Sequence, residues 1–375
     1  MGFTEEEASS AIDICGVHEQ DSVLADAILA AQIFKRDNDS AESVLLNIPQ
    51  EPPYFYFENV ERAPKGVWDE MSRCLYNLAP EYVDSKDFCA ATRKRGYIHN
   101  LPVKGRFHIQ PMQQTKIQEK FPRTRQWWPA WDTRTQLNCI QTVMAPTTAS
   151  NRVREILSDC DGTPSEANQK NILNLCKHWN LIWVGPKTVA PLEPDELESV
   201  LGFPTDHTRG CLTRTERYRS LGNSFQVDTV AFHLSVLKEK FPDGIRVLSL
   251  FTGIGGAEVA LHRLGIRLNV VVSAEISEVN QGILRIWWER SNQKGKLVEM
   301  GDVENINDND LEILVNRFGG FDLVVGGSPC NNISGGNRHS RVGLGGEQSR
   351  LFYHYVRILK QVRKIMRKMK RRALP

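Results

Sequence analysis

Three apolar runs in the second half of the chain constrain the fold most strongly. They cover residues 246–251, 269–273 and 321–325, and each is followed by turn residues and a helical segment, such as the one over residues 257–264. Short continuous apolar runs are typical of parallel strands, because the connecting helices bury them on both faces. The pattern therefore predicts an α/β fold with a mostly parallel sheet and helices on both faces of that sheet.

Composition excludes several classes of protein. The 375 residues are 41% apolar and 25% charged, which is typical of a globular chain with a large core. We expect no membrane span, because the chain lacks a run of about 18 apolar residues. Glu5, Glu6 and Glu7 stand where a secretory signal would be basic and then apolar, which predicts an intracellular protein. The eight cysteines show no C-x-x-C pair or zinc spacing, so we expect reduced thiols and no metal site.

Charge is concentrated at the two ends of the chain. Residues 1–50 carry ten acids against Lys35 and Arg36, whereas residues 357–372 carry nine Lys or Arg and no acid. The basic end favours an anionic partner, such as nucleic acid or a nuclear import receptor. A packed helix with a solvated basic face is the alternative, since apolar residues recur at helical spacing at Ile358, Val362, Ile365, Met366 and Met369.

A glycine-rich turn between the first run and its helix predicts a nucleotide cofactor, because Gly253 and Gly255 allow close approach to the backbone. The turn lacks the third spaced glycine of the dinucleotide fingerprint. Glu275, after the second run, is placed to accept hydrogen bonds from ribose hydroxyls, and Asp302 could accept one from an adenine amino group. This set favours S-adenosylmethionine over NAD, although either acid alone could be a helix N-cap or a surface residue.

Two segments at opposite ends of the chain carry the residues that cytosine-C5 methylation needs. They are Phe57-Glu58-Asn59-Val60 and Ser328-Pro329-Cys330-Asn331. Together with Arg93-Lys94-Arg95 and Leu221-Gly222-Asn223-Ser224-Phe225, they resemble the motifs of DNA cytosine-C5 methyltransferases, specifically the plant domains-rearranged methyltransferases. The resemblance implies a Rossmann-like S-adenosylmethionine-dependent methyltransferase fold. It also implies a circularly permuted motif order, because the 221–225 segment precedes the glycine turn here.

The chemistry explains why these residue types occur together. Cytosine C5 is a poor nucleophile, so a thiolate, here Cys330, adds to C6 first and makes C5 nucleophilic. We expect the site to favour the thiolate form. The resemblance implies that Glu58 protonates N3 and that Asn59 supports the turn around it. It further implies that Arg95 donates to the cytosine O2 and pairs with Glu58, with Arg93 as a second arginine of the site.

The resemblance also implies a set of cofactor contacts, with S-adenosyl-L-homocysteine as the product. The expected contacts are Phe251, Thr252, Gly253, Ile254, Gly255, Glu275, Ile276, Asp302, Val303, Pro329, Leu351, Asn223, Ser224 and Phe225.

Two segments are candidates for binding duplex DNA around a flipped base. The glycine-rich loop over residues 332–348 carries Arg338 and Arg341 and could close on DNA, with an ordinary surface loop as the alternative. Residues 104–205 form the expected target-recognition insert, in which Arg123 and Arg125 lie near several tryptophans. Those tryptophans could equally form a core.

The domain expectations follow from these segments. Residues 1–50 are expected to form an acidic helical segment that resembles part of a ubiquitin-associated domain, so ubiquitin or chromatin-targeting factors are candidate partners. A docked or frayed pair of helices is the alternative. Residues 51–103 and 206–375 form the expected permuted catalytic domain. The resemblance implies that the helix with Phe352, Tyr353 and Tyr355 joins a homodimer, with internal packing of these rings as the alternative. The resemblance implies de novo methylation in RNA-directed DNA methylation and gene silencing in the nucleus. An RNA cytosine-C5 methyltransferase and a non-catalytic chromatin or ubiquitin-binding scaffold are the alternatives.

Overall fold

A seven-stranded sheet forms the centre of the molecule, which is a computed structural model that describes residues 52–109, 114–160, 162–209, 213–335 and 341–373. The order of its strands is β2-β3-β1-β9-β6-β7-β8. The bounds are β1 Tyr54–Val60, β2 Glu81–Asp84, β3 Lys94–His99, β6 Ile245–Leu250, β7 Leu268–Ala274, β8 Lys296–Glu299 and β9 Leu323–Gly326. The helices expected within residues 1–50 lie outside the described residues.

Five neighbouring strands of this sheet are parallel. β1, β9, β6, β7 and β8 run in one direction, and β3 and β2 complete the edge next to β1 in antiparallel pairs. The predicted mostly parallel sheet is therefore confirmed. β1 and β9, the first and last strands of the described residues, pair with each other, so residues encoded far apart reach the same end of the sheet.

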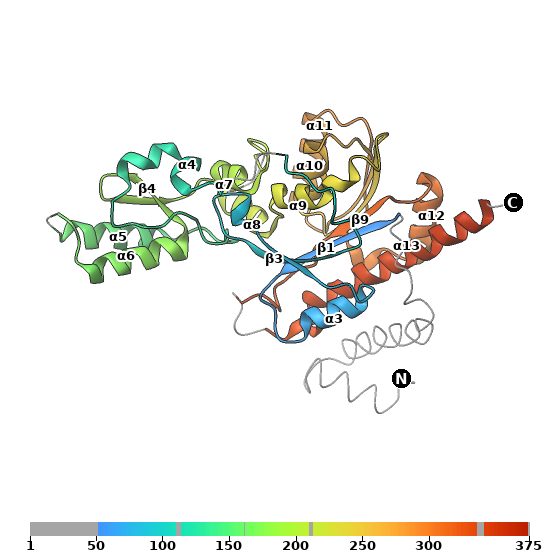
Figure 1. Ribbon diagram of the computed structural model, residues 1–375, viewed down its shortest axis with the longest axis horizontal. Helices are drawn as coiled ribbons and strands as arrows, with labels where there is room; N and C mark the ends of the chain where they lie inside the picture. The colour runs from blue at the N-terminus through green and yellow to red at the C-terminus, as the bar shows by residue number, and fades with distance from the viewer. Residues whose placement is uncertain (1–51, 110–113, 161, 210–212, 336–340, 374–375) are drawn as a thin grey trace, which may run out of the picture.

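Helices cover both faces of the sheet because side chains alternate between two buried clusters along each strand. In β1, Tyr54 and Tyr56 belong to one cluster and Phe55 and Phe57 to the other. The first cluster contains residues of α9 (Val227–Leu234), α10 (Gly256–Arg263) and α11 (Glu278–Arg290). The second contains residues of α3 (Val67–Cys74), α12 (Asp308–Phe318) and α13 (Phe352–Ala373), on the opposite side of the sheet (Figure 1).

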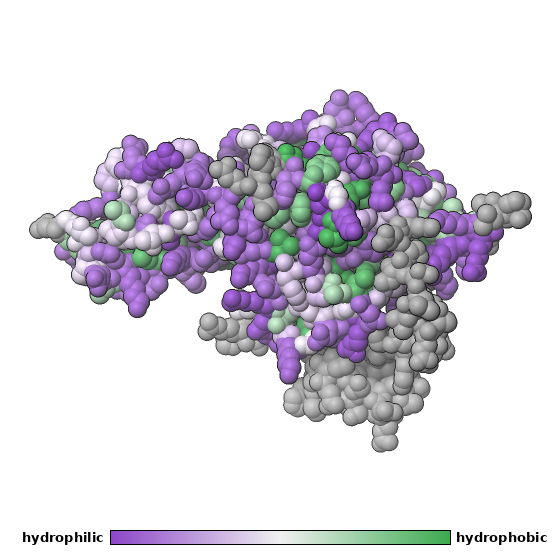
Figure 2. Space-filling view, viewed as in Figure 1, coloured by the Kyte–Doolittle hydropathy of each residue, from purple (hydrophilic) through white to green (hydrophobic). Residues whose placement is uncertain are grey.

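A smaller lobe projects from one side of the sheet (Figure 1). Its helices α5 (Thr147–Ser158) and α6 (Glu166–Trp179) pack against the antiparallel pair β4 (Leu181–Gly185) and β5 (Thr188–Pro191) around a separate apolar core. Hydrophilic residues cover most of this lobe in Figure 2. The short helix α4 (Ile117–Lys120) precedes it, and α7 (Pro194–Leu201) and α8 (Arg214–Asn223) lead back to the sheet.

The last helix differs from the sequence prediction in one respect. α13 continues for 22 residues, and the apolar residues at helical spacing that were expected to pack, among them Val362 and Ile365, are buried as one face of it. Phe352 and Tyr355 are fully buried against Phe57, with ring centroids 5.1 and 5.0 Å away. These two rings are therefore part of the core and do not form the dimer surface that was expected from them.

Within the described part of the chain, no helix combines the length and the apolar character that crossing a membrane requires.

Candidate active site

The ends of β1 and β9 bring the two expected halves of the site together. Phe57 pairs with Gly326, so Glu58 lies beside Gly327 and a Cβ added to Gly327 would be 3.2 Å from the Glu58 carboxylate. The Asn59 amide donates hydrogen bonds to the Ser328 carbonyl oxygen and hydroxyl, at 3.1 and 3.3 Å. The turn that leads into Cys330 is thus held by the strand that carries Glu58.

Glu58 forms a well-shielded ion pair. Arg95 Nε lies 2.9 Å from Glu58 Oε1, and the side chains are only 12% and 11% exposed. Arg95 Nη1 also donates to the carbonyl oxygen of Lys94. Antiparallel pairing of β3 with β1 produces this contact, because it sets Arg95 opposite Val60, close to Glu58 on the neighbouring strand. The carboxylate is therefore oriented by a guanidinium before any substrate enters.

The electrostatics of Cys330 differ from the expectation of a favoured thiolate. Burial raises the pKa of the Cys330 thiol, the positive charge of Arg95 opposes this rise, and the negative charge of Glu58 adds to it. In this state the site favours the thiol. The expectation relied on the adjacent turn or helix N-terminus and on the exclusion of water, and it left out the cost of burying a sulfur anion.

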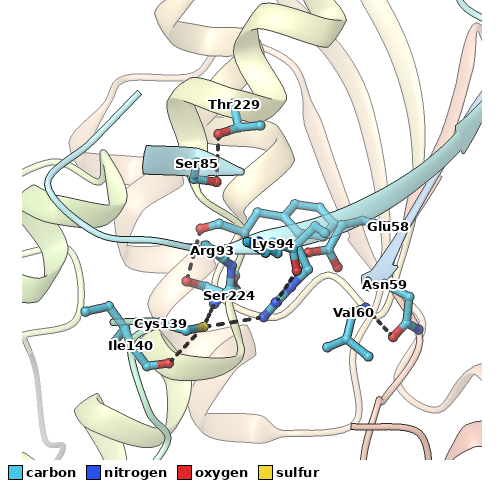
Figure 3. Close-up of polar contacts among 12 residues, drawn as sticks. Glu58, Asn59, Val60, Ser85, Arg93, Lys94, Cys139, Ile140, Ser224 and Thr229 are labelled. Carbon is cyan, nitrogen blue, oxygen red and sulfur yellow. Dashed lines mark hydrogen bonds and ion pairs between the residues drawn. The ribbon is translucent and has the colours of Figure 1, made fainter. Parts of the chain in front are cut away.

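Arg93 does not point toward the Glu58–Cys330 pair. It is 4% exposed and donates hydrogen bonds to the carbonyl oxygens of Gly222 and Ser224, as Figure 3 shows for Ser224. Its Nη1 also lies 3.9 Å from Cys139 Sγ, and Arg95 Nη2 lies 4.0 Å from the same sulfur. Arg93 therefore binds the 222–224 backbone, whereas Arg95 pairs with Glu58.

The glycine turn has the unusual backbone that close approach of a ligand requires. Phe251, Gly253 and Gly255 have positive φ angles of 55°, 59° and 82°, and a phenylalanine rarely adopts this conformation outside functional sites. Glu275 Oε2 accepts a hydrogen bond of 2.8 Å from the Gly253 amide. Thr252 is mostly buried and bonded to the Ser249 carbonyl oxygen, so the turn is rigidly attached to β6.

The residues expected near the adenine fall into two groups. Ile276 is 72% exposed, which is unusual for an isoleucine and leaves an apolar surface next to Glu275. Asp302 accepts a hydrogen bond from the Glu304 amide and caps a short 3-10 helix, which agrees with the alternative that this acid is a helix cap. Val303 is buried in the core. Ile276 and Glu275 are therefore accessible to a bound molecule, whereas Val303 is enclosed in the core.

The 221–225 segment lies between the glycine turn and the turn that precedes Cys330. α8 ends at Asn223 and α9 begins at Val227, so residues 224–226 join these two helices. Added Cβ atoms at Gly256 and Gly327 would be 3.0 Å from Phe225 Cβ and 3.1 Å from Phe225 Cε1, respectively. Phe225 thus contacts both the glycine turn region and the turn before Cys330, whereas Asn223 is exposed and Ser224 is buried.

The loop after Cys330 is closed at its base by residues that sequence reasoning missed. Asn332 Oδ1 accepts from the backbone amides of Gln348 and Ser349, and the Ser349 hydroxyl donates to the carbonyl oxygen of Pro329. Gly346 allows this closure, because an added Cβ would be 2.3 Å from the Asn332 side chain. Leu351, an expected cofactor contact, is partly buried just beyond this base.

Of the four arginines expected to contact DNA, the structure describes three. Arg341 is exposed and donates to the carbonyl oxygens of Ile333 and Arg62, while Arg338 lies outside the described residues. Arg123 is exposed but pairs with Glu196, and Arg125 is exposed. The nearby tryptophans, Trp127, Trp128 and Trp131, are partly buried against the core of the lobe, as the alternative interpretation holds.

Two further buried groups near the glycine turn carry no sequence motif. Burial raises the pKa of the Glu258 carboxyl to about 6, and the Ser249 side chain beside it opposes this rise. His207 Nε2 donates to the carbonyl oxygen of Ile254 at 2.7 Å. The sequence carried a signal for Glu258, because it is an acid within the otherwise apolar 257–261 stretch. His207 could be recognised only from its contact in the folded structure.

Comparisons with known proteins agree with this geometry. A family model described as C-5 cytosine-specific DNA methylase matches residues 245–364, from β6 into α13. The DNA (cytosine-5)-methyltransferase DRM1 of Arabidopsis thaliana is 50% identical over 99% of this chain and 68% of its own length. The DNA (cytosine-5)-methyltransferase DRM2 of Oryza sativa subsp. japonica is 55% identical over 94% of this chain and 58% of its own length. The probable inactive DNA (cytosine-5)-methyltransferase DRM3 of the same rice is 44% identical over 86% of this chain and 47% of its own length.

Proposed function

The chain belongs to the plant domains-rearranged family of DNA (cytosine-5)-methyltransferases, and we propose that Cys330, Glu58 and Arg95 carry out cytosine-C5 methylation in it. The convergence of β1 and β9, which sets the Glu58 carboxylate beside the turn of Cys330, is the observation that supports this proposal most directly. The family is named for DNA, which argues against an RNA substrate. The site residues argue against a scaffold without catalysis.

The proposed reaction begins with the Cys330 sulfur adding to C6 of a cytosine that has been flipped out of the duplex. Electron density moves toward N3, where the Glu58 carboxylic acid donates a proton, and C5 becomes nucleophilic. General acid assistance of this kind contributes roughly 10²–10⁴-fold to a rate. Arg95 orients Glu58 through its 2.9 Å contact and would donate to the base carbonyl oxygen.

The protonation states that the reaction requires support one another. Glu58 must carry a proton to act as an acid, and Cys330 must lose one to act as a nucleophile. Because the negative charge of Glu58 raises the pKa of Cys330, protonating Glu58 removes that effect. A proton on the carboxyl group therefore prepares both residues, while Arg95 continues to favour the thiolate.

The residues around the glycine turn fit S-adenosyl-L-methionine. It supplies an electrophilic methyl group and leaves as S-adenosyl-L-homocysteine. The open backbone at Gly253 can approach it closely, whereas Gly255 packs against Leu284. Glu275 Oε2 lies at the turn to accept ribose hydroxyls, and exposed Ile276 offers an apolar surface for a purine ring. Phe225 lies between this turn and Cys330 and would contact the methyl-donor end.

The finer features of the family are part of the same proposal. The position of β1 beside β9 supports a circularly permuted motif order, and the separate core of the lobe supports a target-recognition role for residues within 104–205. Exposed Arg125 and Arg341 are candidates for phosphate contacts. De novo methylation in RNA-directed gene silencing would place the chain in the nucleus, and a homodimer would have to use residues other than Phe352 and Tyr355.

The test uses duplex DNA that contains 5-fluorocytosine together with S-adenosyl-L-methionine. After methyl transfer the fluorine cannot leave C5 as the proton does, so the sulfur–C6 bond persists. We expect a covalent adduct with the native chain, none with Cys330→Ala, and an undiminished adduct with Cys160→Ala, which changes a remote thiol. An adduct in Cys330→Ala would overturn the assignment of the nucleophile. No adduct with the native chain would favour the scaffold, and methyl transfer to structured RNA in preference to duplex DNA would favour the RNA enzyme.

A further inference from the structure

The last turns of α13 present a basic face that has no acidic partner among the described residues. Lys364, Arg367, Lys368 and Arg371 are exposed, while Val362, Ile365 and Met366 of the same turns are buried. The first turns differ, since His354 lies near Glu304 and Arg357 near Asp308. We call the four exposed residues the basic face of α13. Figure 2 shows this end of the helix as strongly hydrophilic.

This face is remote from the proposed catalytic residues. α13 begins just after the loop that follows Cys330 and runs back along the sheet (Figure 1). At 1.5 Å per residue, Arg371 lies about 28 Å along the helix axis from Phe352. A cytosine held between Glu58 and Cys330 therefore does not account for the charge of this face.

The acidic part of the chain enters the structure at this place. Arg363 Nη2 donates to the carbonyl oxygen of Pro53 at 3.2 Å, so residues 1–51 join the described structure directly beside α13. Arg363 is only 5% exposed, its guanidinium lies 4.7 Å from the Tyr76 ring centroid, and its Nη1 has no partner within the described residues. A buried guanidinium nitrogen without an acceptor is costly, which points to an acceptor on the entering segment.

We propose that the basic face of α13 is a docking surface for the acidic segment 1–50 of the same chain. That segment carries ten acids against two bases, a net charge of −8, and opposes four exposed cations. Because the segment is tethered beside Arg363, its effective concentration at the face is on the order of millimolar or higher. Single exposed ion pairs contribute little, so docking depends on several pairs together and weakens with salt.

Zero-length carbodiimide cross-linking of the full chain, read by mass spectrometry, tests this proposal. We expect Lys364 and Lys368 to be joined to acids of residues 1–50 at low salt. The yield should fall about fivefold or more in 0.5 M NaCl, where the Debye length shrinks from about 10 Å to about 4 Å. Arg367→Glu/Arg371→Glu keeps both reporting lysines and should reduce their cross-links by a similar factor. Arg152→Glu/Arg154→Glu, two exposed arginines of α5, is the matched control and should leave the yield unchanged.

Three results would overturn the proposal. One is the absence of cross-links between the segment and these lysines in the native chain, and another is a yield that Arg367→Glu/Arg371→Glu leaves unchanged. The third is protection of Lys364 and Lys368 from acetylation only after duplex DNA is added, which would assign the face to nucleic acid. Unchanged circular dichroism and methyl transfer in the α13 variant would show that it is folded, because the substituted residues lie outside the proposed catalytic site.

Discussion

At the scale of single residues, Glu58 has two proposed effects. It donates the proton that cytosine N3 needs, and its charge changes the pKa of the Cys330 thiol that attacks the base. Its carboxylate pairs with Arg95 at 2.9 Å and raises the pKa of Cys330. A neutral residue of the same shape separates these effects, because glutamine cannot donate a carboxylic proton but also carries no charge. Glu58→Gln should therefore be a poorer methyltransferase with a more acidic Cys330.

We expect Glu58→Gln to lower the rate of methyl transfer by roughly 10²–10⁴-fold, the contribution of a general acid. The pH at which Cys330 is half-alkylated by iodoacetamide, followed on its own peptide by mass spectrometry, should shift downward. Glu312→Gln removes an exposed carboxylate of α12 and should change neither quantity. An unchanged alkylation profile in Glu58→Gln would show that Glu58 does not act on the sulfur electrostatically.

At the scale of elements, the tight approach of β1, β9 and the 224–226 segment depends on Gly327. A Cβ there would lie 3.0 Å from the Glu58 carbonyl oxygen and 3.1 Å from Phe225 Cε1. Gly327→Ala should move the ends of both strands apart and cost about 1–3 kcal/mol of stability, as overpacking does. It should also lower 5-fluorocytosine adduct formation in urea-free buffer, where the chain remains folded.

Gly282→Ala is the matched control for Gly327→Ala. An added Cβ at Gly282 meets no atom within 4 Å, and the residue lies within α11, so alanine should be neutral or slightly stabilising there. Urea unfolding and adduct yield measure both variants. If Gly327→Ala keeps the native adduct yield, the close approach of the strand ends is not needed for the reaction.

The elements that could be predicted from the sequence are those whose signal is local. The apolar runs before Gly253, Glu275 and Cys330 predicted strands that are confirmed to within one or two residues at most ends. Arg93 stays a prediction for the site, because its hydrogen bonds to the 222–224 backbone arise from packing between distant segments and leave no local pattern in the sequence. Phe352 and Tyr355 suggested a subunit surface only because sequence does not show that Phe57 lies beneath them.

Contacts between distant segments could not be predicted in the same way. The closure of the loop by Asn332 and Ser349 joins residues 17 positions apart through hydrogen bonds that leave no periodic pattern. The contact of His207 with the Ile254 carbonyl oxygen spans 47 positions. Such contacts depend on how whole elements pack, which is the scale at which a single sequence carries least information.

At the scale of the whole molecule, a buried charged cluster ties the first third of the chain to its middle. His233 of α9 accepts a hydrogen bond from the Tyr56 hydroxyl at Nδ1, and its Nε2 lies 3.6 Å from Glu81. Burial lowers the pKa of His233, although Glu81 opposes this shift. Burial alone would raise the pKa of Glu81, but the nearby His233 and hydrogen bonds from His99 and Arg106 hold it well below its usual range. The charged and titratable groups that surround His233 are Tyr56, Glu81, Tyr97, His99 and Arg106.

These shifts fix how stability depends on pH. Between pH 6.5 and the lowered pKa of His233, the unfolded chain binds a proton at this histidine that the folded chain does not bind, so stability falls as pH decreases. Below about pH 4.5 the unfolded chain also protonates Glu81 while the folded chain does not, and stability falls further. Each group contributes a slope of at most about 1.4 kcal/mol per pH unit.

His233→Asn should lower stability at pH 7.5, since it removes the Tyr56 contact, and should flatten the slope between pH 6.5 and 5.5. His178→Asn, an exposed change on α6, should leave both unchanged in urea unfolding. An equal slope in the His233 variant and the native chain would mean that the other buried histidines, not this cluster, set the acid sensitivity of the fold.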